Sequence, residues 1–118
     1  MDMNSLLVFG AALVLYFAWK RFGPNHAASG KVILEKIAGG AIIIDVRTAG
    51  EFSSGAYPKA RNIPLDVLGS KFDKIGAKDK SVIVYCASGS RSAQAAKMLK
   101  AAGFTGVTNA GGFHSMPR

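Results

Sequence analysis

Residues 81–91, SVIVYCASGSR, decide how this 118-residue chain is expected to fold. The β-branched and aromatic residues of 81–85 are typical of a buried strand. Residues 92–102 are rich in good helix formers, and Gly103 follows them as a natural helix end. The single cysteine of the chain, Cys86, is therefore predicted at a turn from a strand into a helix.

Cys86 is the candidate catalytic residue. A free cysteine is often no more than a small buried apolar residue. At this turn, however, backbone N–H groups of the loop and of the first helical turn point toward the sulfur and stabilise negative charge there. The thiol is therefore expected to ionise below its usual pKa of about 8.5. The residues expected to form the anion-binding loop are Ala87, Ser88, Gly89, Ser90, Arg91 and Ser92.

Predicted helices and strands alternate along the rest of the chain. Helices are expected at 31–38, from a capping box at 48–51, and at 65–72, and extended segments at 41–46, 60–64 and 105–109. This alternation predicts an α/β fold, a small parallel sheet with helices on both faces. Ligands of such sheets bind beyond the carboxyl ends of the strands, where Cys86 and Asp45 are expected.

Asp45 and Arg47 are expected to support the loop rather than to react. A carboxylate at the end of a buried strand must be paired or hydrogen-bonded, and Asp45 is expected to bond loop N–H groups or an arginine. Arg47 and Glu51 are four residues apart near a helix start, and this spacing predicts an ion pair between them. For Arg91, two roles stay open: orienting an anionic substrate, or pairing with a carboxylate.

The N-terminal segment is unlike the rest of the chain. No charged residue occurs from Met3 to Trp19, and these seventeen residues predict a helix of about 25 Å, close to the roughly 30 Å of a membrane core. We expect a transmembrane helix at 3–22, a linker at 23–30 and one domain at 31–118. A cleaved signal peptide and a buried core helix are the alternatives.

Lys20 and Arg21 follow the apolar run, and by the positive-inside rule they place the domain in the cytoplasm. The expected protein is thus a single-pass membrane protein, or a periplasmic or secreted one if a signal peptide is cleaved. A single cysteine fits a reducing compartment and excludes an internal disulfide, a CxxC redox pair and a cysteine-rich zinc site. No metal and no cofactor are expected.

The net charge is +8, from 15 Lys and Arg against 7 Asp and Glu. Nucleic-acid binding is not expected, because the lysines are scattered and no aromatic residues alternate with them as stacking platforms. A basic face against anionic lipid, or an electric field that attracts small anions, explains the charge as well.

Four motifs in sequence order resemble the single-domain rhodaneses. They are Asp45-Val46-Arg47 with Glu51-Phe52, Gly55 through Asn62-Ile63-Pro64, Val84-Tyr85-Cys86 with Gly89 and Arg91, and Gly111-Gly112-Phe113. The resemblance runs from about Lys31 to the end of the chain. Two positions depart from the family pattern: Ala56 stands where many members have histidine, and Met116 lies near a frequent tryptophan.

This resemblance implies a rhodanese-like fold and a sulfurtransferase. Cys86 would take sulfane sulfur from thiosulfate or a similar small anionic donor, hold it as a persulfide and pass it to a thiol, to cyanide or to a protein acceptor. A rhodanese-like module that binds a partner or senses redox state without turnover is the alternative. The loop also resembles that of the cysteine phosphatases, but in their pattern five residues separate the cysteine from the arginine. Here four residues separate Cys86 from Arg91. The shorter loop favours a sulfur atom over a phosphate.

Overall fold

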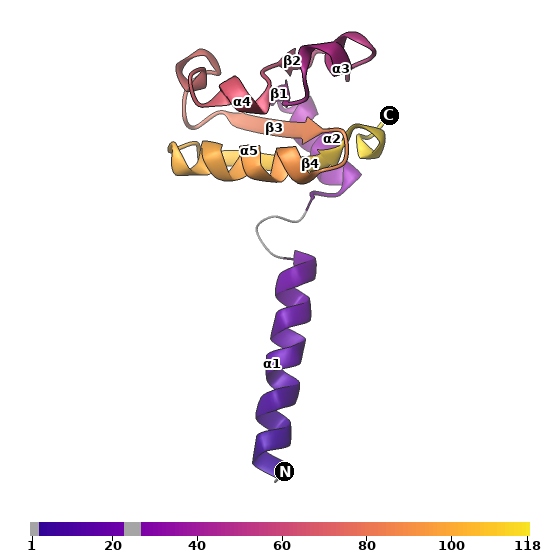
Figure 1. Cartoon of the computed structure of the whole chain (residues 1–118), viewed down its shortest axis with the longest axis vertical. Coiled ribbons are helices and arrows are strands. Elements are labelled where there is room, and N and C mark those ends of the chain that lie inside the picture. The colour runs from indigo at the N-terminus through magenta and orange to yellow at the C-terminus, as the bar shows by residue number, and fades with distance from the viewer. Residues whose placement is uncertain (1–2, 23–26) are drawn as a thin grey trace.

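The computed structural model describes residues 3–22 and 27–118, in which four parallel strands form one sheet in the order β2-β1-β3-β4 (Figure 1). The strands are β1 (Ile42–Asp45), β2 (Arg61–Asn62), β3 (Ser81–Cys86) and β4 (Gly106–Gly112). The helices are α1 (Met3–Phe22), α2 (Gly30–Ala38), α3 (Ala49–Ser53), α4 (Leu65–Leu68) and α5 (Ser90–Ala101), with short 3₁₀ turns η1 (Phe72–Lys74) and η2 (Phe113–Ser115).

Helices cover both faces of the sheet, as the alternation of elements predicts. Successive side chains of a strand point to opposite faces, so β3 contributes to two cores. Val82, Val84 and Cys86 pack with the residues of α4 and α5, including Leu68 and Leu99. On the other face, the core that contains Ile33 of α2 is formed by Ile33, Ile43, Ile83, Tyr85, Ala110 and Met116. The expected α/β fold with a parallel sheet is confirmed.

Two predicted elements differ from those observed. The helix expected at 65–72 ends at Leu68, with Gly69 as its C-terminal cap, and a separate 3₁₀ turn starts at Phe72. The strand expected at 105–109 continues to Gly112. The pairing with β3 shifts register at this point: Val84 pairs with Asn109, and the next residue, Tyr85, pairs with Gly111. The extra residue, Ala110, forms a bulge that strand periodicity alone does not predict.

The predicted helix at 3–22 is observed as α1, which stands apart from the domain (Figure 1). Its expected role as a transmembrane span is not supported. Within residues 3–22 and 27–118, no helix combines the length and the apolar character needed to cross a bilayer.

The expected linker at 23–30 lies partly outside the described residues, which resume at 27. There the chain runs beside β4, and the Ala28 N–H donates to the Asn109 carbonyl over 2.8 Å. The Ala27 side chain reaches the backbone of Gly111, where an added Cβ would lie 3.1 Å from it. Gly30 then begins α2, which Ser29 caps. The domain therefore starts on β4, immediately before α2.

Candidate active site around Cys86

Cys86 ends β3 at the carboxyl edge of the sheet, and only three residues separate it from α5. Gly89 has φ +107°, a left-handed conformation that lets the chain turn back into the helix. Gly112 of β4 lies against the other side of the loop, where an added Cβ would be 2.7 Å from the Ala87 carbonyl oxygen. Two glycines thus allow the tight loop that the sequence predicts.

The Cys86 sulfur is buried and hydrogen-bonded. It accepts the Gly89 N–H over 3.0 Å and lies 3.5 Å from the Ser92 hydroxyl oxygen. Burial by itself raises the pKa of the Cys86 thiol. The Ser92 hydroxyl and the backbone N–H groups of Ser92, Gly89 and Ser88 outweigh it, and the pKa is lowered overall. The loop therefore favours the thiolate, the nucleophilic form of cysteine.

The structure brings the predicted loop residues together in two groups. Gly89 donates its backbone N–H to the sulfur, and the backbone N–H groups of Ser88 and Ser92 also lower the pKa of Cys86. Ala87, Ser88 and Ser90 have exposed side chains and form the outer rim of the loop. All are at the start of α5, where helix N–H groups and the helix dipole favour an anion.

Arg91 pairs with a carboxylate, one of the two roles that the sequence left open. Its guanidinium donates to both oxygens of Glu51, at 2.6 and 2.9 Å. Glu51 also closes a capping box with Thr48 at the start of α3. The Arg91 hydrogen bond, followed by the Thr48 N–H, lowers the pKa of Glu51 to about 2. This pair ties the Cys86 loop to α3.

Asp45 and Arg47 form a buried ion pair. The Arg47 N–H and Nε donate to Oδ1 of Asp45 at 2.9 and 3.0 Å, and a terminal nitrogen donates to Oδ2 at 2.7 Å. That nitrogen also donates to the Gly55 carbonyl, and the guanidinium lies 4.6 Å from the Phe113 ring centre. The expected pairing of Asp45 is confirmed. The expected Arg47–Glu51 pair is wrong, because each of the two residues has a different partner.

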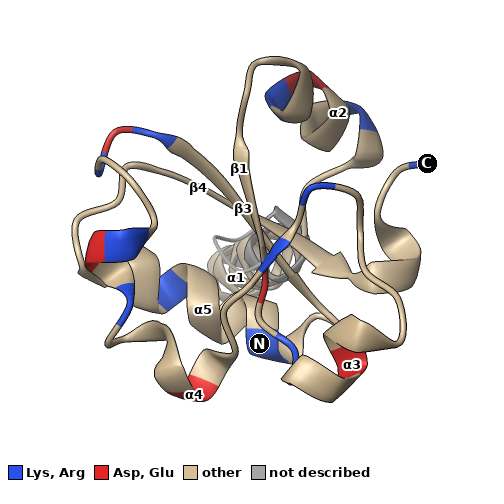
Figure 2. Cartoon of the chain, turned by 90° about the horizontal axis from the view of Figure 1, so that it is seen from above, with Lys and Arg blue, Asp and Glu red and all other residues tan. Residues whose placement is uncertain are grey.

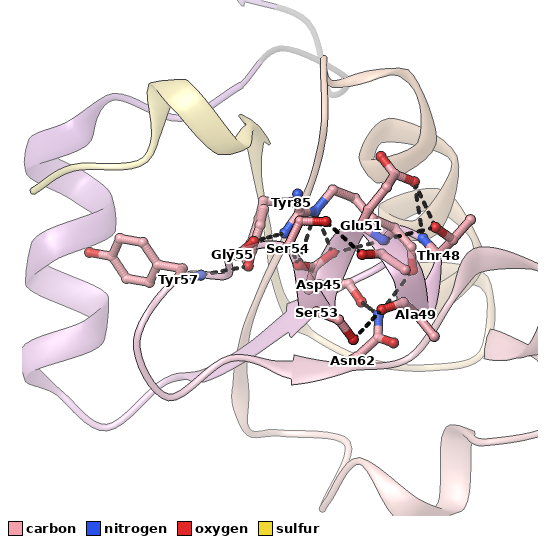
Figure 3. Close-up of polar contacts among 12 residues, drawn as sticks. Asp45, Thr48, Ala49, Glu51, Ser53, Ser54, Gly55, Tyr57, Asn62 and Tyr85 are labelled. Carbon is pink, nitrogen blue, oxygen red and sulfur yellow. Dashed lines mark hydrogen bonds and ion pairs between the residues drawn. The ribbon is translucent and has the colours of Figure 1, made fainter.

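Two further polar side chains, Asn62 and Tyr85, hold the backbone around the Asp45–Arg47 pair (Figure 3). The sequence patterns predicted neither role. Asn62 of β2 donates to the carbonyls of Asp45 and Arg47, at 3.1 and 2.9 Å. The Tyr85 hydroxyl accepts the Tyr57 N–H at 2.9 Å, and burial above all raises the pKa of Tyr85 to about 12. For Asn62 the sequence did offer a signal, namely an amide side chain within the extended segment expected at 60–64. Tyr85 gives no such signal within an apolar strand.

In the described part of the chain, no three His, Cys, Asp or Glu side chains are grouped so as to hold a metal ion. The chemistry that this geometry offers is that of a thiolate at a helix N-terminus. Such a group attacks an electrophilic atom, and its N–H donors stabilise the negative charge of the product.

The fold and the loop define a class: small parallel α/β domains that carry a nucleophilic cysteine between a strand and a helix. Within that class, this chain belongs to the rhodanese-like domain family, whose sequence pattern matches residues 29–116. The family resemblance drawn from the four motifs is therefore confirmed.

Individual relatives agree with this assignment. A sulfurtransferase of Allochromatium vinosum is 35% identical over 58% of this chain, and the match spans 63% of that protein, less than two thirds of its length. Thiosulfate sulfurtransferase PspE of Escherichia coli is 36% identical over 64% of this chain and 75% of its own length. The solved structure of the human single-domain sulfurtransferase TSTD1 superposes with a TM-score of 0.70 at 26% identity, covering 75% of this chain and 92% of that one.

Proposed function

We propose that this chain is a rhodanese-type sulfurtransferase that carries sulfane sulfur on Cys86. The observation that supports it best is the buried Cys86 sulfur, which accepts the Gly89 N–H over 3.0 Å and whose pKa is lowered by its hydrogen bonds. A cysteine with only a packing role needs no such donors. Relatives named sulfurtransferase add support from a second side.

The proposed reaction has two steps. The Cys86 thiolate attacks the outer sulfur of thiosulfate and forms a disulfide bond to it, and the sulfur–sulfur bond of thiosulfate breaks with its electron pair leaving on sulfite. The product is a Cys86 persulfide anion, which the loop N–H groups stabilise. A thiolate or cyanide then attacks the outer sulfur, and the electron pair of the broken bond returns to Cys86.

Thiosulfate is the proposed donor class for electrostatic reasons as well. It is a small dianion, and the chain has a net charge of +8. Lysines and arginines lie on several helices and loops of the domain (Figure 2). This distribution attracts a diffusing anion from many directions. At the loop, the N-terminus of α5 and its N–H groups would hold the anion once it arrives.

The test is a loading experiment on the full chain. Protein incubated with thiosulfate should gain the mass of one sulfur atom on Cys86, and adding cyanide should release thiocyanate and remove that mass. Cys86→Ser is the matched control and should gain nothing. If the native chain shows no mass gain and releases no thiocyanate, the enzyme is excluded. A binding or redox-sensing module would then remain.

Localisation is a second part of the proposal: α1 attaches the chain to a membrane, with the domain in the cytoplasm. What supports attachment is the described surface of α1, whose large apolar side chains are 48 to 75% exposed from Met3 to Phe17. An apolar surface of this extent needs an apolar partner. The free thiol of Cys86 supports a reducing compartment.

Cell fractionation tests attachment, and a reporter fused to the C-terminus tests the side. The chain is expected in the membrane fraction after a high-salt wash, and a variant without residues 1–26 in the soluble fraction. A C-terminal reporter that is active only outside the cytoplasm should show no activity. Equal fractionation of the two proteins would count against attachment, and an active reporter would count against a cytoplasmic domain.

A further inference from the structure

Ser92, in the first turn of α5, is fully buried against the Cys86 sulfur. Three possible acceptors surround its hydroxyl oxygen: the Gly89 carbonyl at 3.0 Å, the Gly111 carbonyl at 3.3 Å and the Cys86 sulfur at 3.5 Å. A serine hydroxyl has one proton to donate. Ser92 can therefore serve only one of these acceptors at a time.

The charge on Cys86 decides which acceptor Ser92 serves. A protonated thiol is itself a donor, and in the structure it donates to the Ser92 oxygen, which leaves the Ser92 proton for a carbonyl. An ionised thiol only accepts, and a buried anion is costly without donors. Turning the hydroxyl to the sulfur costs the loop little, because the Gly89 carbonyl keeps the Ala93 N–H at 3.1 Å.

We propose that the Ser92 hydroxyl is a catalytic group that donates to the Cys86 sulfur whenever that atom is anionic and returns to a backbone carbonyl when the charge moves away. Its role in turnover rests on the proposed sulfur transfer. The Cys86 sulfur is anionic before it attacks the donor. It is anionic again when it leaves the persulfide, whereas in the persulfide itself the charge lies on the outer sulfur.

This role has opposite effects on the two steps. A donor to the thiolate increases the thiolate fraction at low pH, makes each thiolate a weaker nucleophile and makes it a better leaving group. Removing the hydroxyl should therefore slow loading at low pH only, and slow unloading at every pH. A serine that merely braces the loop predicts something else, namely that its loss slows both steps at all pH values.

Other charged groups near Cys86 keep their own partners. Arg91 of α5 is bound to Glu51 of α3, and Asp45, the last residue of β1, is bound to Arg47. On β4, residues 106–112 include no charged side chain. Glu51 has a pKa of about 2 and Tyr85 one of about 12, so neither changes charge over the pH range in which a cysteine titrates. A shift in that range reports on Cys86 itself.

The decisive experiment titrates the thiolate of the full chain by its ultraviolet absorbance, with Cys86→Ser as the blank. Ser92→Thr and Ser92→Val form a matched pair, since they have nearly the same shape and differ in the hydroxyl. Ser92→Ala adds no atoms and covers the case in which the larger side chains do not fit the buried position. Ser70→Ala removes another hydroxyl that donates to a carbonyl, far along the chain from the loop, and serves as the control.

We expect Ser92→Val and Ser92→Ala to titrate at higher pH than the native chain, with a thiolate fraction about tenfold lower at acidic pH. Ser92→Thr and Ser70→Ala should titrate like the native chain. In single-turnover assays, Ser92→Ala should load more slowly than the native chain at low pH but at least as fast at high pH, where its thiolate is the stronger nucleophile, and its unloading should be slower at every pH. Identical titrations of Ser92→Thr and Ser92→Val, with Ser92→Ala unshifted, would overturn the inference. The titration needs no sulfur donor, so it stands even if thiosulfate fails to load Cys86.

Discussion

The guanidinium of Arg91 donates to both carboxylate oxygens of Glu51, at 2.6 and 2.9 Å, and so connects the first turn of α5 to α3 across forty positions of sequence. Glu51 serves two structures at once, because it also caps α3 through Thr48. The charge of this single carboxylate therefore holds a helix start and the Cys86 loop in one arrangement.

Stability in acid should depend on Glu51. Its pKa falls from 4.5 to about 2 on folding, so its stabilising effect is complete above pH 4.5 and is lost as the pH falls toward 2. Chemical unfolding of the native chain and of Glu51→Gln should show a stability difference that narrows over this window. Glu35→Gln, at an exposed carboxylate of α2, is the control. Parallel curves for Glu51→Gln and the native chain would contradict the prediction.

Asp45→Asn should destabilise the domain strongly. Asp45 is fully buried and the Arg47 side chain is 8% exposed, so the substitution leaves a buried guanidinium without its counter-charge. Removing one partner of a buried pair costs about 3–5 kcal/mol. Urea unfolding measures the loss, and Asp66→Asn, at an exposed carboxylate of α4, should change it by less than about 0.5 kcal/mol. A small loss for Asp45→Asn as well would refute the structural role of the pair.

Gly112→Ala should disturb the loop without straining its own backbone. Gly112 has φ −88°, which alanine adopts freely, but the new Cβ would lie 2.7 Å from the Ala87 carbonyl oxygen. We expect a loss of about 1–3 kcal/mol and slower sulfur loading. Gly50→Ala in α3, where an added Cβ meets only the Thr48 hydroxyl at 4.0 Å, is the matched control. Equal loading by both variants would show that the loop tolerates the shift.

Sulfur loading should lose rate as the pH falls through the pKa of Cys86. Hydrogen bonds from the loop lower this pKa below 9.0, so the rate should be half-maximal below pH 9. Stopped assays with saturating thiosulfate over a pH series measure the profile. A half-maximal rate at pH 9 or above would mean that the loop does not stabilise the thiolate.

Sequence patterns predicted the sheet and the cysteine loop because both depend on neighbouring residues. A buried strand, a glycine and a helix-forming run are contiguous from 81 to 102, and each is recognisable alone. Buried charge likewise predicted that Asp45 would be paired. These parts of the fold and of the site are local in the chain.

The partners of Arg47 and Glu51 were not predictable in this way. Helical spacing favoured pairing them with each other, but Arg47 precedes the helix and turns back to Asp45. Arg91 reaches Glu51 only because β1 and β3 are neighbours in the sheet. Pairing across such distances depends on the tertiary structure, which the spacing of residues does not contain.

The hydrogen bond from Ala28 to the Asn109 carbonyl has a practical consequence for any shortened form of this protein. β4 is the last strand of the sheet on its side, and the outermost strand of a sheet is a template for pairing with another molecule. Residues 27 and 28 cover part of that template beside Gly111. A chain begun at Lys31 would keep the whole sheet but uncover this edge of β4, and such a fragment is expected to associate through β4 more readily than the longer chain does.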